Sequence, residues 1–244
     1  MHKERSDWYG WRARLGLIYT SSSTIMESEF YAMAPRGVSS HTTRVYLGSV
    51  TADELAQTGA RAVDAARLLA TAPLDAIVFG CTSGSFLMGP DYDAGLIAEL
   101  ASVSKSIPVT TTTSAIARGL RELGIHKLVI ATPYTDDINV RAQEYFEAIG
   151  HEVLYTRGLG ISTDLEMTSL APEAVYDLAR SAWRPEADGM VISCTSLRTI
   201  EILQELEADL GKPVVTANQA SFWATLRMAG VNERVDGFGR LLAL

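Results

Sequence analysis

The feature that most constrains the fold of this chain is an internal repeat that carries its cysteines. Two segments, DAIVFGCTSGS (75–85) and DGMVISCTSLR (188–198), each place an acidic residue before a short apolar run that ends in Cys-Thr-Ser. They contain the only cysteines among the 244 residues, Cys81 and Cys194, which lie 113 positions apart. Two thiols at matching points of one local pattern indicate that the chain consists of two similar halves.

Two further pairs of segments support this repeat. The run RLGLIYTSSS (14–23) resembles KLVIATPYTD (127–136), again 113 positions later. SIPVTTTTSAIARGLRELGI (106–125) resembles GKPVVTANQASFWATLRMAGV (211–231) at an offset of 105, which predicts a shorter loop in the second half. Each half therefore reads as strand, helical segment, cysteine-bearing strand, helix, proline-started strand and helix.

The periodicity of these segments predicts an α/β fold. Apolar residues recur at helical spacing in 52–70 and 171–183. The expected strands are short and apolar throughout, as in parallel sheets that helices cover on both faces. We therefore expect two similar doubly wound parallel-sheet lobes that face each other across a pseudo-two-fold axis.

The expected boundaries follow from the repeat. Residues 1–12, with Trp8, Tyr9 and Trp11, form an N-terminal extension that packs on its own lobe or across a subunit contact. The first lobe spans 13–118 and the second 119–244. The pattern leaves open whether the segment 211–244 completes the first lobe.

Composition excludes several classes of partner. The net charge is −8, whereas nucleic-acid binding requires clustered Lys and Arg. No run approaches the roughly 18 apolar residues of a membrane span, and the charged start MHKERSDWYGWRAR is unlike a signal peptide. We therefore expect a cytoplasmic protein with reduced thiols, no nucleic-acid partner and no membrane partner. The cysteine spacing and the scattered histidines give no support for a metal site.

The carboxyl ends of parallel strands carry the functional loops of such folds. Cys81-Thr82-Ser83 and Cys194-Thr195-Ser196 both occupy such ends, so facing lobes would bring the two thiols to one cleft from opposite sides. A buried structural cysteine is the alternative for either residue taken alone. A following helix N-terminus would lower the thiol pKa, and the N–H and hydroxyl groups would hold a carboxylate.

This arrangement suits chemistry at the carbon next to a carboxylate. One thiolate would remove a proton or add as a nucleophile, and the other thiol would deliver a proton on the opposite face. Hydrogen-bond donors would hold the developing enediolate, and no cofactor is required.

Other polar residues follow the expected strands. Ser22 and Ser23 end the first strand and are either turn residues or ligands of the substrate. Tyr134, at the corresponding point of the second half, is a candidate donor to a carboxylate. Thr111 is expected to cap a helix and is a second candidate donor, whereas Asp136 and Asp137 are expected to cap theirs.

These residues resemble the aspartate/glutamate racemase superfamily, and within it the branch of maleate cis–trans isomerases and arylmalonate decarboxylases. The resemblance runs from RLGLIYTSSS to the terminal GFGRLL, and GLRELGIHKLVIATPYTDDIN (119–139) is especially similar to the decarboxylases. It implies two lobes, a cofactor-free site between them, a small carboxylate substrate and a homo-oligomer. It also implies that Tyr134 is the site tyrosine.

Differences within that branch bear on the reaction. The isomerases and racemases have both cysteines, whereas the decarboxylases have glycine in place of Cys81, so the pair favours isomerisation or racemisation. Two asparagines of the maleate isomerases are absent: Ser21-Ser22-Ser23 replaces Ser-Ser-Asn, and GISTDLE (160–166) offers Ser162 and Thr163 but no Asn.

Three functions remain open from the sequence. The leading hypothesis is a cofactor-independent isomerase or racemase of a small carboxylic acid, with Cys81 as nucleophile or base and Cys194 as proton donor. The second is a decarboxylase of malonate-type acids that uses Cys194 alone. The third is a two-lobed binding protein for a small acid, because a fold does not by itself fix a function.

Overall fold

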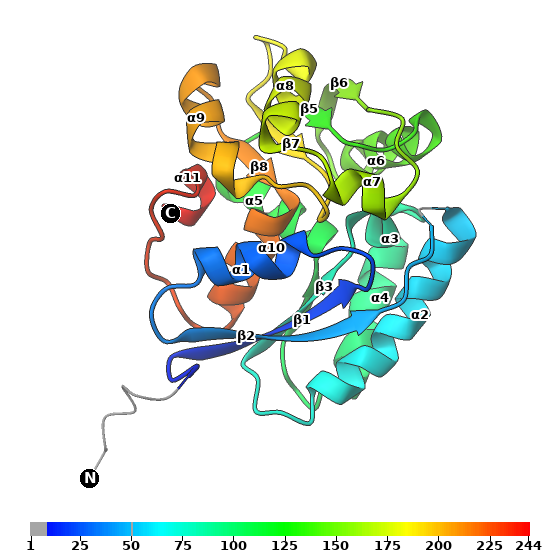
Figure 1. The fold of residues 1–244 in the computed structure, drawn as a ribbon, viewed down its shortest axis with the longest axis vertical. Helices are drawn as coiled ribbons and strands as arrows, with labels where there is room; N and C mark the ends of the chain where they lie inside the picture. Colours follow the sequence, from blue (N-terminus) through cyan, green and yellow to red (C-terminus); the bar gives the residue numbers. More distant parts are fainter. Residues whose placement is uncertain (1–8, 50) are drawn as a thin grey trace.

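A computed structural model describes residues 9–49 and 51–244, so Trp8 and most of the expected N-terminal extension lie outside the described residues. Figure 1 shows its strands in two groups with helices around and between them. The elements of the first half are β1 (Ala13–Thr20), α1 (Ile25–Met33), β2 (Val38–Val45), α2 (Ala52–Leu69), β3 (Ala76–Gly80), α3 (Thr82–Phe86), α4 (Pro90–Val103), β4 (Val109–Thr111) and α5 (Thr112–Glu122). Those of the second half are β5 (Lys127–Ala131), α6 (Asp136–Ala148), β6 (Glu152–Arg157), α7 (Asp164–Thr168), α8 (Pro172–Ala182), β7 (Gly189–Ile192), α9 (Ile200–Leu210), β8 (Val214–Thr216), α10 (Ala217–Met228) and α11 (Gly239–Leu242).

The strands form two four-stranded sheets with the same topology. Their orders are β2-β1-β3-β4 and β6-β5-β7-β8, and every pair of neighbours is parallel. The expected pair of similar α/β lobes is therefore confirmed, the first built on β1–β4 and the second on β5–β8. The repeated order puts β3 and β7, the two strands that precede the cysteines, at equivalent central places.

The acidic residue that opens each repeated segment fixes the start of the neighbouring strand. Asp75 accepts a hydrogen bond from the N–H of Arg14 (2.7 Å), and Asp188 accepts one from the N–H of Lys127 (2.9 Å). Both carboxylates therefore hold β3 against β1 and β7 against β5 at the same point of the repeat. The apolar residues that follow are fully buried in β3 and β7, as the sequence predicts.

Two strands were not expected from the sequence. β2 (VSSHTTRV) and β6 (EVLYTR) are edge strands whose side chains are mostly half-buried or exposed. Their polar residues interrupt the continuous apolar run by which the sequence predicts the other strands. Thr, Val and Tyr nevertheless favour extended backbone, and the central strands supply hydrogen-bond partners on one side only.

Helices α1 and α10 join the two lobes. The rings of Phe30 and Phe222 meet edge to face with centroids 5.2 Å apart. Glu29 of α1 accepts hydrogen bonds from the N–H of Thr199 (2.6 Å) and of Ile200 (3.1 Å), at the start of α9 in the second lobe. Within 211–244, β8 belongs to the second sheet while α10 packs against α1 and β3, so this segment contacts both lobes (Figure 1).

Among the described residues, no helix is long and apolar enough to cross a membrane. At the described start of the chain, the side chain of Tyr9 is 95% exposed and that of Trp11 is 37% exposed. The Trp11 ring covers Gly37, whose positive φ of 87° is a conformation that glycine adopts without strain.

Candidate active site

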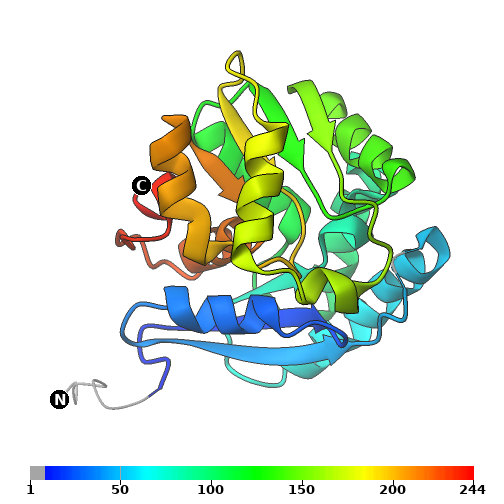
Figure 2. The same cartoon turned by 45° about the horizontal axis from the view of Figure 1, so that its top comes forward.

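A narrow cavity lies where the two lobes meet, and both cysteines line it. Its volume is about 10 Å³, enough for roughly one water molecule. In Figure 2, α7 of the second lobe lies against the loop that follows β1 of the first. The lining residues are Thr20, Leu47, Cys81, Thr82, Ser83, Tyr134, Asp164, Met167, Cys194, Thr195 and Ser196.

The first thiol stands between a strand and a short helix. Cys81 follows β3 in an extended conformation and occupies the N-cap position of α3, and it is 3% exposed. Gly84 and Ser83 both donate hydrogen bonds to its sulfur. A Cβ atom on Gly84 would lie 2.9 Å from Sγ, so the close approach of this backbone to the thiol requires glycine. The next helix, α4, begins only after Gly89, whose positive φ of 87° interrupts the helical backbone between α3 and α4.

The second thiol has a different setting. Cys194 is also 3% exposed, but a turn follows it and α9 begins only at Ile200, so the expectation that a helix starts directly after it is wrong. The N–H of Ser196 approaches Sγ at 3.4 Å, and Tyr134 donates its hydroxyl to the same sulfur. Met167 of α7 covers the thiol with Sδ 3.9 Å from Sγ.

The expectation that the thiol pKa values are lowered is also wrong. Burial is the largest cause and raises the pKa of Cys81 to about 12 and that of Cys194 to about 12. The nearby carboxylate of Asp164 raises both values further, and the hydrogen bonds to each sulfur only partly offset this. Both groups are therefore uncharged thiols at neutral pH in this closed form.

Hydroxyl groups line the cavity beside Cys81. Thr82 and Ser83 both line the cavity, and Oγ1 of Thr82 is buried without a hydrogen-bond partner among the described residues. Tyr134 is 3% exposed and its ring meets Phe86 of α3 edge to face at 6.2 Å. Burial raises the pKa of Tyr134 well above its ordinary value, so this residue is a neutral hydrogen-bond donor.

Sequence reasoning missed four residues that line the cavity, namely Thr20, Leu47, Met167 and the one charged residue among them, Asp164. It is the first residue of α7 and 7% exposed. Its Oδ2 accepts hydrogen bonds from Ser22 (2.5 Å) and Thr20 (3.4 Å), and its Oδ1 accepts one from Ser196. The available signal was the Thr163-x-x-Glu166 pattern, a helix-start motif whose Thr163 side chain does cap α7.

Ser22 and Ser23, predicted as substrate ligands, are placed behind the cavity wall. Ser22 is connected to the site by the hydrogen bond that its hydroxyl donates to Asp164. Ser23 is fully buried and accepts a hydrogen bond from the hydroxyl of Tyr19, whose own pKa is raised by burial. Thr195 and Ser196, in contrast, line the cavity directly.

The other polar residues that the sequence analysis named have structural roles. Thr111 caps α5 and donates to Asp93 at 2.6 Å, which confirms the expected cap. Asp136 and Asp137 lie in the first turn of α6, but the N-cap residue is Thr135, so neither is the cap that the sequence suggested. Among the described residues, no group of three or more His, Cys, Asp or Glu side chains could hold a metal ion.

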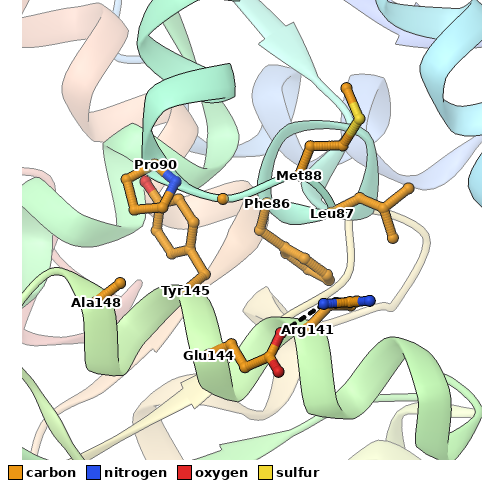
Figure 3. A pocket seen from close by; sticks show the side chains of 9 residues that line it. Phe86, Leu87, Met88, Pro90, Arg141, Glu144, Tyr145 and Ala148 are labelled. Atoms are coloured by element: carbon orange, nitrogen blue, oxygen red, sulfur yellow. Dashed lines mark hydrogen bonds and ion pairs between the residues drawn. The ribbon is translucent and has the colours of Figure 1, made fainter.

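A larger hollow lies outside this site. Figure 3 shows it between the α3–α4 junction and α6, with a volume of about 430 Å³ and an Arg141–Glu144 ion pair of 2.9 Å at its wall. Neither cysteine lines it, although its Phe86 ring also contacts Tyr134 edge to face. The chemistry-bearing groups therefore gather in the smaller cavity.

Comparison with known proteins agrees with this geometry. Residues 15–242 match the family described as arylmalonate decarboxylase. The chain belongs to this family. An arylmalonate decarboxylase of Bordetella bronchiseptica is 33% identical over 198 residues, which cover 80% of this chain and 82% of that protein.

The family relatives include a second activity. A maleate isomerase of Nocardia farcinica is 28% identical, and the match covers 94% of this chain and 95% of that protein. A solved structure of a Nocardia farcinica maleate cis–trans isomerase mutant, with a covalently bound succinylcysteine intermediate, matches with a TM-score of 0.91 at 26% identity. That match covers 95% of this chain and 98% of the other. The resemblance to both branches, expected from the sequence, is therefore confirmed.

Proposed function

We propose that this protein is a cofactor-independent isomerase or racemase of a small carboxylic acid. The observation that carries the proposal is the pair of thiols, Cys81 from the first lobe and Cys194 from the second, on one hydroxyl-lined cavity. The relatives are enzymes, and the Nocardia isomerase structure contains a covalently bound succinylcysteine intermediate, which favours catalysis over a two-lobed binding protein.

In the isomerase form of the reaction, the two sulfurs share one proton. Cys81, as the thiolate, adds to a carbon of the substrate double bond, and the displaced electron pair takes the proton of Cys194. Rotation about the resulting single bond follows. The Cys194 thiolate then removes that proton, the carbon–sulfur bond breaks, and the Cys81 thiolate returns.

In the racemase form, one thiolate removes the α-proton and the other thiol protonates the opposite face of the planar enediolate. The groups placed to hold its oxygens are Thr82, Ser83 and Tyr134. Either form requires one thiol to lose its proton when substrate enters, because burial keeps both neutral in the closed cavity.

Substitution of each cysteine tests the proposal. Cys81→Ser and Cys194→Ser should each reduce turnover at least a thousandfold with little change in melting temperature. NMR in deuterated water should follow maleate, malate and aspartate, because deuterium enters an α-position only when a carbanion is protonated. Full activity in both variants on an accepted substrate would contradict the proposal.

A decarboxylase is the second candidate, favoured by the 33% identity to the Bordetella enzyme. It would use Cys194 alone to protonate the enediolate left by loss of carbon dioxide. Cys81→Gly should then preserve or raise carbon dioxide release from an arylmalonate, whereas the isomerase proposal expects Cys81→Gly to be inactive on its own substrate.

A homo-oligomeric state and a cytoplasmic location belong to the same proposal. Light scattering of the purified protein would measure the first.

A further inference from the structure

We propose that Asp164 makes this site select an acid with a single carboxylate and, at the other end, a nitrogen that donates a hydrogen bond. This inference rests on the proposed function, since it concerns the substrate class of the same cavity. An ammonium and an amide share the required chemistry, whereas a dicarboxylate lacks it.

The first step is the hydrogen bonding of Asp164. Three hydroxyl groups, those of Thr20, Ser22 and Ser196, converge on its two oxygens from both lobes. A carboxylate only accepts hydrogen bonds. The converging hydroxyls therefore hold the Asp164 carboxylate in a fixed position as an acceptor on the cavity wall.

The second step is the lack of a compensating cation. The residues that line the described cavity include no Lys, Arg or His. Arg44 lies behind the wall, where it donates to the carbonyl oxygens of Ser21 (3.0 Å) and Ser23 and pairs with Glu27 at 3.4 Å. A second substrate carboxylate beside Asp164 would put two like charges together in a buried space, which is strongly unfavourable.

The third step is the set of hydroxyl donors that line the same cavity. Thr82, whose hydroxyl has no partner among the described residues, and Ser83 follow Cys81 directly in the chain. These donors suit a carboxylate, so the cavity presents both hydroxyl donors and the carboxylate acceptor of Asp164. A bound N–H group would also offset the charge of Asp164 and so favour ionisation of the nearby thiols.

Three unreactive probes, each with four carbon atoms, test this inference through binding alone. They are succinate, succinamate and 4-aminobutyrate, titrated at pH 7 into the full-length protein by calorimetry or NMR. The wild type should bind succinamate or 4-aminobutyrate at least tenfold more tightly than succinate. The stronger of the two identifies the amide or the ammonium as the preferred donor.

Asp164→Asn provides the second arm, because an amide presents a donor as well as an acceptor. This substitution should reduce the preference for succinamate or 4-aminobutyrate over succinate at least tenfold. Asp177→Asn, the same change at an exposed position of α8, should leave that preference unaltered. Tighter binding of succinate by the wild type, or no binding of any probe, would overturn the inference even if Asp164→Asn failed to fold.

The binding test is separate from the test of catalysis. A confirmed preference with no turnover of any acid would leave the substrate class standing and refute the isomerase. Turnover of maleate together with tighter binding of succinate would support the isomerase and refute the inferred substrate class.

Discussion

At the scale of single residues, the two thiols are equally buried but accept hydrogen bonds from different donors. Cys81 receives hydrogen bonds from Gly84 and Ser83, while Cys194 receives them from Ser196 and Tyr134. Neither set is strong enough to overcome desolvation, so both sulfurs rest as neutral thiols. A neutral thiol is a weak nucleophile, so an attack by either sulfur would require that its proton first be removed.

This resting state predicts slow alkylation. With pKa values of about 12, against an ordinary value of 9.0, each thiol should react with iodoacetamide at pH 7 about a thousandfold more slowly than a free thiol. The rate should rise about tenfold for each pH unit up to pH 10 without a plateau, because the thiolate fraction rises in that proportion. Mass spectrometry of the two cysteine peptides measures both rates.

The control is Asp164→Asn, which removes a negative charge that raises both pKa values. It should speed the labelling of both cysteines, whereas Asp177→Asn should leave the rates as they are. A plateau below pH 8 in the wild type would show an accessible thiolate and contradict the neutral resting state.

These residues also show what sequence reasoning can and cannot reach. The sequence could predict that Cys81, Cys194 and their Thr-Ser neighbours share one cavity, because the repeat and the strand-end rule are local features; their catalytic and binding roles stay a prediction. Asp164 was not predicted, because its partner Ser22 lies 142 positions away and because the described residues between β2 and α2 form no helix that corresponds to α7. The direction of the thiol pKa shifts likewise depends on desolvation, which only tertiary closure produces.

At the scale of secondary-structure elements, a buried carboxylate joins the lobes. Glu29 of α1 is 5% exposed and accepts hydrogen bonds from Thr199, Ile200 and Asn218. It thereby supplies partners to the first N–H groups of α9, a role that usually belongs to the N-cap residue of the same helix. Sequence analysis could not find this contact, since it spans about 170 positions.

Glu29 predicts a pH effect on stability. Burial raises its pKa in the folded state above the ordinary value of 4.5. The raised pKa favours folding below pH 4.5, and that contribution is lost as the pH rises towards the folded-state pKa, because the unfolded chain ionises first. Compared with Glu29→Gln, which does not titrate, the wild type should therefore lose stability as the pH rises from about 4 to 7.

Denaturant unfolding at several pH values measures this difference, and Glu173→Gln, an exposed change in the first turn of α8, is the control. A wild type that gains stability over Glu29→Gln across the same range would show that the hydrogen bonds outweigh desolvation. The folded-state pKa would then be lowered, contrary to the prediction.

At the scale of the whole molecule, the repeat accounts for the sheets but not for the way the lobes are joined. Equal strand orders follow from equal sequence patterns, and the proline-started strands were found as β4 and β8. The edge strands β2 and β6 were missed because their exposed faces are polar. The proposed boundary between residues 118 and 119 remains a prediction, and the contact of α10 with both lobes shows why local patterns do not define it.

The contacts between the lobes predict that the molecule unfolds in one cooperative transition. Phe222 of α10 is fully buried against Phe30 of α1, and Ser221 donates to Thr112 of α5 at 2.9 Å. With Glu29 and the Phe86–Tyr134 pair, these contacts leave neither lobe a complete core of its own. Calorimetry should therefore give one transition whose calorimetric and van't Hoff enthalpies agree.

Two substitutions distinguish this coupling from independent lobes. Phe222→Ala should destabilise the protein by about 3–5 kcal/mol, as expected for a buried aromatic side chain. Phe146→Ala is the matched control, because Phe146 is equally buried but packs against Tyr145 and His151 within the second lobe. If the lobes are coupled, both variants shift one single transition. If Phe146→Ala instead splits the profile and leaves a wild-type-like transition for the first lobe, the lobes fold independently, and a cavity shared between them would open without unfolding either one.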